Sequence, residues 1–78
     1  MIPRSGFMNI LVFKTSITAH EQIAQVSPLL DGMPTIKHWN FDLEDCDNIL
    51  RIVSNSLDPE AVELLLQSAG YQCQELAD

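Results

Sequence analysis

The chain has 78 residues, of which 46% are apolar and 19% charged, and its 11 acidic side chains outnumber its 4 basic ones. This length accommodates one domain without a second core, and the apolar fraction argues against a disordered chain. The net charge of −7 argues against a nucleic-acid or anionic-membrane surface, because both need clustered lysine and arginine.

The number of cysteines and the length of the apolar runs indicate the cellular compartment of the protein. Cys46 and Cys73 are the only cysteines, too few for a disulfide framework, and no apolar run approaches the ~18 residues that span a bilayer. We therefore expect reduced thiols and a cytoplasmic protein. The start, MIPRSGFM, lacks the features of a signal peptide. We expect a flexible leader over residues 1–8, with Met8 as an alternative start, and a single domain over 9–78.

The first predicted elements are a strand and a helix. The run NILVF, residues 9–13, is typical of a central strand. Thr18 followed by Glu21 fits a capping box, which predicts that the helix begins after Thr18. The apolar stripe of this helix comprises Ile23, Val26 and Leu30.

Proline and glycine predict the end of this helix, and the pattern of apolar and polar residues predicts the next two strands. Pro28 is expected to loosen or kink the last turn, and Gly32 to end the helix in a left-handed conformation. The alternating segment TIKHWNFDL, residues 35–43, predicts a half-buried strand. A polar turn around Cys46 then leads to the return strand ILRIV, residues 49–53, which completes a hairpin.

The second helix has the clearest start signal in the chain. Asp58 is an expected N-cap, and Pro59 occupies the first helical position. Gly70 is expected to end the helix, and residues 71–76 to form a short last strand. The expected buried face of this helix comprises Val62, Leu65, Leu66 and Ala69.

The predicted element order is strand, helix, strand, strand, helix, strand. Right-handed crossovers place the third strand between the first and second, and the fourth on the other side of the first. The fold class is therefore α+β: a ferredoxin-like βαββαβ sandwich whose antiparallel sheet has the order 4-1-3-2 and carries both helices on one face.

This order and two local segments resemble the heavy-metal-associated (HMA) domain, the fold of small copper chaperones. The segments are LLDGM at 29–33 and DPEAVELLLQSAGYQCQEL at 58–76. The resemblance covers roughly residues 9–76. It implies a role in metal handling and two cysteines in a Met-x-Cys-x-x-Cys loop after the first strand, which together hold Cu(I).

Counting without gaps places the two family cysteines at Ser16 and Ala19, and the family methionine at Lys14. Cu(I) is a soft ion that selects thiolate and thioether ligands, whereas serine offers a hard, protonated oxygen and alanine offers no donor. We therefore expect a degenerate HMA-like domain with no metal ligands at its family positions and no cofactor. The sequence shows no catalytic set either, so we do not expect an enzyme.

The sequence is compatible with three functions. The leading hypothesis is a protein-interaction or regulatory module, linked to metal homeostasis, that meets an unknown partner protein. Its expected interaction loop comprises Lys14, Thr15, Ser16, Thr18, His20 and Tyr71. The second is a binder of copper or another heavy metal that uses His20, Cys46 and Cys73 as non-standard ligands. The third is a small-ligand sensor that forms a homodimer through its sheet face or an edge strand.

Overall fold

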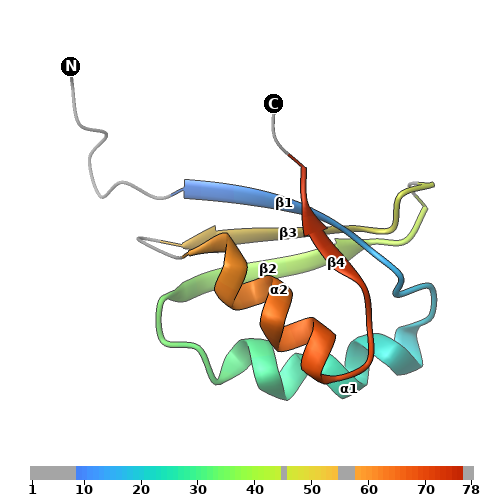
Figure 1. The fold of residues 1–78 in the computed structure, drawn as a ribbon, viewed down its shortest axis with the longest axis horizontal. Coiled ribbons are helices and arrows are strands. Elements are labelled where there is room, and N and C mark those ends of the chain that lie inside the picture. The colour runs from blue at the N-terminus through green and yellow to red at the C-terminus, as the bar shows by residue number, and fades with distance from the viewer. Residues whose placement is uncertain (1–8, 45, 55–57, 77–78) are drawn as a thin grey trace.

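The computed structural model of the protein describes residues 9–44, 46–54 and 58–76, so the expected leader over 1–8 lies outside the described residues. Within these ranges, no helix is long and apolar enough to cross a membrane. The elements are, in chain order, β1 (Asn9–Thr15), α1 (His20–Asp31), β2 (Ile36–Asp42), β3 (Ile49–Ser54), α2 (Pro59–Ser68) and β4 (Cys73–Glu75) (Figure 1).

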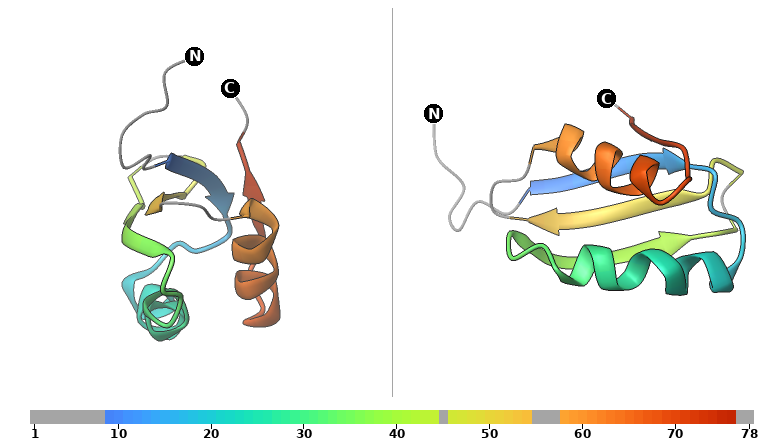
Figure 2. Two further views of the ribbon diagram at one scale, coloured as in Figure 1. Left: turned by 90° about the vertical axis from the view of Figure 1, so that its left-hand side faces the viewer. Right: turned by 60° about the horizontal axis from the view of Figure 1, so that its bottom comes forward.

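The sheet has the predicted topology. Its four strands lie in the order β2-β3-β1-β4, and every neighbouring pair is antiparallel. Both helices cover the same face of the sheet (Figure 2). The prediction of a ferredoxin-like α+β sandwich is therefore confirmed, and the other sheet face, here called the outer face, is left without a helix.

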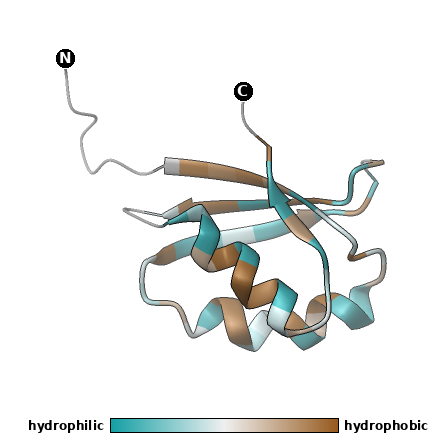
Figure 3. Cartoon of the chain, viewed as in Figure 1, coloured by the Kyte–Doolittle hydropathy of each residue, from teal (hydrophilic) through white to brown (hydrophobic). Residues whose placement is uncertain are grey.

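The core lies between the sheet and the two helices. On β1 and β3, Phe13 lies opposite Leu50, and Leu11 lies opposite Ile52, so alternate residues of both strands point towards the helices. Apolar residues follow β1 and β3 and recur in both helices (Figure 3). The buried cluster comprises Phe13, Ile17, Val26, Leu30, Leu50, Ile52, Val62, Leu66 and Cys73.

The start of α1 differs from the prediction. Thr18 is not the N-cap: the helix begins at His20, and Ala19 precedes it with no side-chain cap. Instead, the side chain of Gln22 reaches back, and its Oε1 accepts hydrogen bonds from the backbone N–H of Thr18 at 2.7 Å and of Ala19 at 3.1 Å. The Thr18 hydroxyl also donates to this oxygen, at 3.3 Å, so it does not act as the predicted cap.

The end of α1 also differs. The helix continues past Pro28 to Asp31, and Gly32 adopts a right-handed conformation with φ of −78°. The prediction of a left-handed stop is wrong here, because the Gly32 N–H still donates to the Pro28 carbonyl, at 3.0 Å, in the helical manner.

The second half of the chain follows the prediction more closely. Asp58 caps α2 by accepting from the N–H of Glu60 at 3.0 Å, and Pro59 is the first helical residue. Gly70 is left-handed, with φ of 95°. The last strand is shorter than predicted, because the N–H groups of Tyr71 and Gln72 donate to the Leu66 carbonyl and the Ser16 hydroxyl rather than to the ladder of β1.

Candidate functional site

The loop between β1 and α1 lies at the same end of the domain as the β2–β3 turn and the turn between α2 and β4. Two contacts fix this arrangement: the backbone of Thr15 bonds to the β2–β3 turn, and that of Ser16 bonds to Gln72. We use the name loop end for the set of predicted interaction residues: Lys14, Thr15, Ser16, Thr18, His20 and Tyr71.

Ser16 occupies the first of the two positions that the resemblance assigns to family cysteines. Its backbone N–H donates to the Gln72 carbonyl at 3.1 Å. Its hydroxyl oxygen accepts from the N–H of Gln72 at 2.9 Å. Ser16 thus joins the loop to the residue that precedes β4, and its side-chain oxygen has a structural partner.

Thr15 is buried, with 6% of its surface exposed. Its hydroxyl donates to the carbonyl of Asn48 at 2.7 Å and accepts from the N–H of Ile17 at 3.2 Å. Both polar functions of this buried hydroxyl are therefore satisfied, which stabilises the loop relative to the hairpin turn. Thr15 shapes the loop end from inside and does not present its side chain at the surface.

The remaining loop-end residues line the surface. Lys14, Ser16, Thr18 and His20 are exposed, and Tyr71 is half-buried. The Tyr71 hydroxyl donates to the side-chain oxygen of Gln25, which links the α2–β4 turn to α1.

The charges at this end are mixed. Lys14 Nζ lies 3.9 Å from Asp47 Oδ1, in an exposed pair. His20 lines a hollow of about 350 Å³ together with Asp42, the last residue of β2, and Glu44 in the turn that follows. The loop end therefore offers neither a strongly basic nor a strongly acidic surface.

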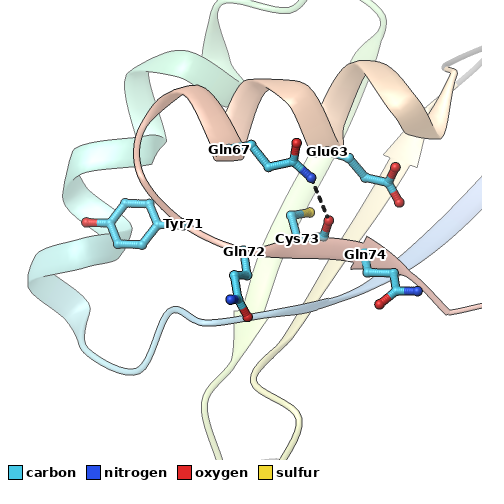
Figure 4. A pocket seen from close by; sticks show the side chains of 6 residues that line it. All are labelled: Glu63, Gln67, Tyr71, Gln72, Cys73 and Gln74. Atoms are coloured by element: carbon cyan, nitrogen blue, oxygen red, sulfur yellow. Dashed lines mark hydrogen bonds between the residues drawn. The ribbon is translucent and has the colours of Figure 1, made fainter.

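The proposed alternative ligands are differently placed. Cys46 is exposed and Cys73 is buried, and both are free thiols. Cys73 lies beneath Gln67 in the groove between α2 and β4 (Figure 4). Burial, with a further contribution from the Glu63 carboxylate, raises the pKa of the Cys73 thiol from its ordinary 9.0 to about 12. The thiol stays protonated at neutral pH, whereas a metal ligand must be a thiolate.

The residues of the loop do not fit a Cu(I) ion. Among residues 9–44, 46–54 and 58–76, no group of three or more histidine, cysteine, aspartate or glutamate side chains is placed to hold a metal. His20, Cys46 and Cys73 are thus not gathered into one site. At the family positions, Ser16 supplies an oxygen that accepts from Gln72, and Ala19 supplies no donor.

Several residues that organise this end have no signal in the sequence. Gln22, Gln25 and Gln72 each bond to the loop or to a neighbouring segment. Glutamine on a helix or before a strand has the pattern of an ordinary surface residue, so only the tertiary arrangement identifies these partners.

Comparison with known proteins identifies the fold. The sequence matches no protein-family model and no curated protein. Among solved structures, the chain is similar to the apo form of the HMA domain of a copper chaperone for superoxide dismutase, with 21% identity over 90% of this chain and 68% of that one, at a TM-score of 0.74. It is also similar to the copper(I)-loaded first domain of the human copper chaperone for SOD1, with 22% identity over 87% and 92% of the two chains, at a TM-score of 0.73. The chain therefore has an HMA-like fold of the copper-chaperone type.

Proposed function

We propose that this protein is a non-enzymatic, cytoplasmic HMA-like module, linked to metal homeostasis, that recognises a partner protein through its loop end without carrying a metal itself. One observation supports this most directly: the Ser16 hydroxyl accepts from the N–H of Gln72, so the first family ligand position serves a structural bond. The likeness in fold to copper-chaperone domains supports the link to metal handling.

The local chemistry favours recognition over transport. A transported Cu(I) ion needs soft donors that can be exchanged with a partner, and the family positions here provide none. The loop itself is held in one conformation by three hydrogen bonds: the Gln72 N–H donates to the Ser16 hydroxyl, and the Gln22 side-chain oxygen and the Thr15 hydroxyl accept from backbone N–H groups of the loop. A preorganised loop loses less conformational entropy on binding, which favours its use as a recognition surface.

A metal titration tests the first part of this proposal. Under reducing conditions with a competing chelator, we expect the protein not to bind Cu(I) more tightly than about 10 μM, which corresponds to roughly −7 kcal/mol. The Ser16→Cys/Ala19→Cys variant should gain tight Cu(I) binding, because two thiolates would then stand in the family loop. The matched control, Ala24→Cys/Ser27→Cys, has the same spacing on α1 and should gain much less.

Tight binding by the unaltered protein would overturn the metal-free role. Failure of the Ser16→Cys/Ala19→Cys variant to exceed its control would instead contradict the assignment of Ser16 and Ala19 to the family positions.

Partner recognition is tested by charge changes at the surface. Lys14→Glu and His20→Glu alter exposed side chains of the loop end, whereas Lys37→Glu makes a matched change on β2. A partner captured by cross-linking should be retained by the Lys37→Glu variant and lost from both loop-end variants. Equal recovery with all three variants would place the recognition surface elsewhere.

A further inference from the structure

β2 and β4 are the two edge strands of the sheet, and they differ in whether the backbone groups on their free edges have hydrogen-bond partners. On β4, the N–H of Glu75 donates to Oε2 of Glu63 at 2.7 Å. The carbonyl of Cys73 accepts from Nε2 of Gln67 at 3.4 Å. Figure 4 shows both α2 side chains beside the strand. These side chains occupy backbone groups that an added strand would need, so the β4 edge is closed to strand addition.

The register of the sheet shows which groups of β2 face outwards. The N–H of Thr15 donates to the carbonyl of the residue before β3. Because successive residues of a strand alternate, Phe13 also directs its N–H and C=O at β3, where it lies opposite Leu50. The backbone N–H and C=O of Leu50 therefore point at β1. Those of its neighbour Arg51 point at β2, where Arg51 lies opposite Asn40.

On β2, the backbone of Asn40 thus bonds inwards, and the backbones of Trp39 and Phe41 point away from the sheet. In the described part of the chain, no hydrogen bond satisfies these outward N–H and C=O groups. The side chains of both residues are half-buried on the helix side of the sheet. Their rings pack edge to face, with the ring centroids 5.8 Å apart. The β2 edge therefore joins unpaired backbone groups to a partly exposed aromatic pair, the features of a strand-pairing site.

We propose that this edge pairs with the β2 strand of a second copy of the chain, antiparallel, about a twofold axis that passes beside Asn40. In this register, Trp39 of each copy lies opposite Phe41 of the other. Each such pair exchanges two backbone hydrogen bonds and places an indole against a phenyl ring on the same face. The inference is independent of the proposed function, because it concerns a surface outside the loop end.

The charges of β2 support a second copy as the occupant. The whole chain carries −7, which opposes self-association, but β2 contains one lysine and one aspartate and is neutral as a strand. In the proposed register, the exposed His38 of one copy faces Asp42 of the other. The Asp42 carboxylate accepts from the Glu44 N–H at 3.1 Å and lies 3.7 Å from Arg51, and its remaining lone pairs can accept the imidazole N–H. A second copy of β2 thus supplies both an aromatic partner for Trp39 and an acidic partner for His38.

The features of β2 that discourage strand pairing lie outside residues 38–42, the segment proposed to pair. The register between β2 and β3 shifts between Ile36 and His38, and Lys37 lies at this irregularity. Bulges and edge lysines discourage strand pairing, so they limit the contact to residues 38–42. A contact of this length buries less than the roughly 1,200 Å² of a stable interface, so the dimer should be weak and reversible.

Disulfide trapping tests the register. On the axis, the two Asn40 residues form a non-hydrogen-bonded pair with Cα atoms ~4.5 Å apart, which is within the range for a disulfide. In a Cys46→Ser background, Asn40→Cys should form a covalent dimer at least about tenfold faster than Gln74→Cys, whose exposed position lies on the closed edge. Equal rates for the two variants would overturn the proposal.

A charge variant tests the same contact without a new thiol. His38→Glu places two like-charged pairs in the dimer and should raise its dissociation constant about tenfold, as measured by sedimentation at several concentrations. Gln74→Glu adds the same charge to the other edge strand and should have little effect. A protein that stays monomeric up to ~1 mM, or a His38→Glu variant that self-associates like Gln74→Glu, would contradict the proposed pairing.

Discussion

The core beneath the sheet and the loop end are stabilised by different forces. In the core, Phe13, Leu50 and Ile52 pack against apolar side chains of both helices, and all three are fully buried. At the loop end, Thr15 and Ser16 are held by hydrogen bonds to segments that lie 33 and 56 residues further along the chain. The core contributes most of the free energy of folding, whereas the bonds at the loop end select one conformation for a surface.

This difference identifies the contacts that hold the loop end in shape. In a metal site, the ion itself joins the segments that supply its ligands. Here a serine hydroxyl, a threonine hydroxyl and the side chain of Gln22 join the loop to its surroundings. Substitutions in the two regions should therefore separate loss of stability from loss of local order.

The largest expected effect comes from the core. Phe13→Ala removes a fully buried ring and should lower the free energy of unfolding by about 3–5 kcal/mol, as measured by urea unfolding followed by circular dichroism. The matched control is Leu64→Ala on α2, a residue that is 65% exposed, and it should change stability by less than about 0.5 kcal/mol. Similar losses for both variants would mean that Phe13 does not anchor this core.

The next effect depends on pH and on Cys73. Its pKa in the folded protein is about 12, against an ordinary 9.0, so the unfolded chain loses the thiol proton first as the pH rises. The stabilising contribution is complete below pH 9, and it should fall by roughly 1.4 kcal/mol per pH unit as the pH approaches 12.

Cys73→Ala provides the comparison, because every other titrating group is retained. The difference in unfolding free energy between the two proteins should shrink above pH 9. A difference that stays constant from pH 8 to 11 would contradict the raised pKa.

The smallest of these effects belongs to the loop end. Thr15→Val preserves the shape of the side chain, but it removes one of the two hydrogen bonds that the Asn48 carbonyl accepts from Thr15, and it leaves the N–H of Ile17 without its acceptor. We expect a loss of about 1–3 kcal/mol together with faster hydrogen exchange at Ile17. Thr18→Val alters an exposed hydroxyl and should have a much smaller effect, so equal losses would show that burial of Thr15 does not matter.

The sequence predicts the fold well because its signals are local. Asp58 followed by Pro59 defines the start of α2 through contacts within one turn, and the alternation around Trp39 defines β2. The start of α1 is less predictable. Thr18 fits a capping pattern, but the side chain of Gln22 reaches back and accepts from the backbone N–H groups of Thr18 and Ala19. The conformation at Gly32 does not follow from the sequence, because glycine permits a left-handed turn but does not require one.

The site is predictable only in part for a related reason. Ser16 and Ala19 stand out because the resemblance assigns ligand positions to them. The role of Ser16 in bonding Gln72 depends on how β4 pairs with β1, which no local pattern encodes. Likewise, Thr15 reads as an exposed loop residue, whereas its place opposite Cys73 in the sheet makes it an interior one.

One feature of β2 gives the protein an internal optical probe. Trp39 is the only tryptophan, and its indole Nε1 donates to Asp31 Oδ1 at 2.9 Å across the gap between strand and helix. Its emission therefore originates from a single environment, half shielded by α1 and half open to the solvent. Any event that covers the strand, or that draws the helix away from it, should shift the wavelength of that emission without a dye or label.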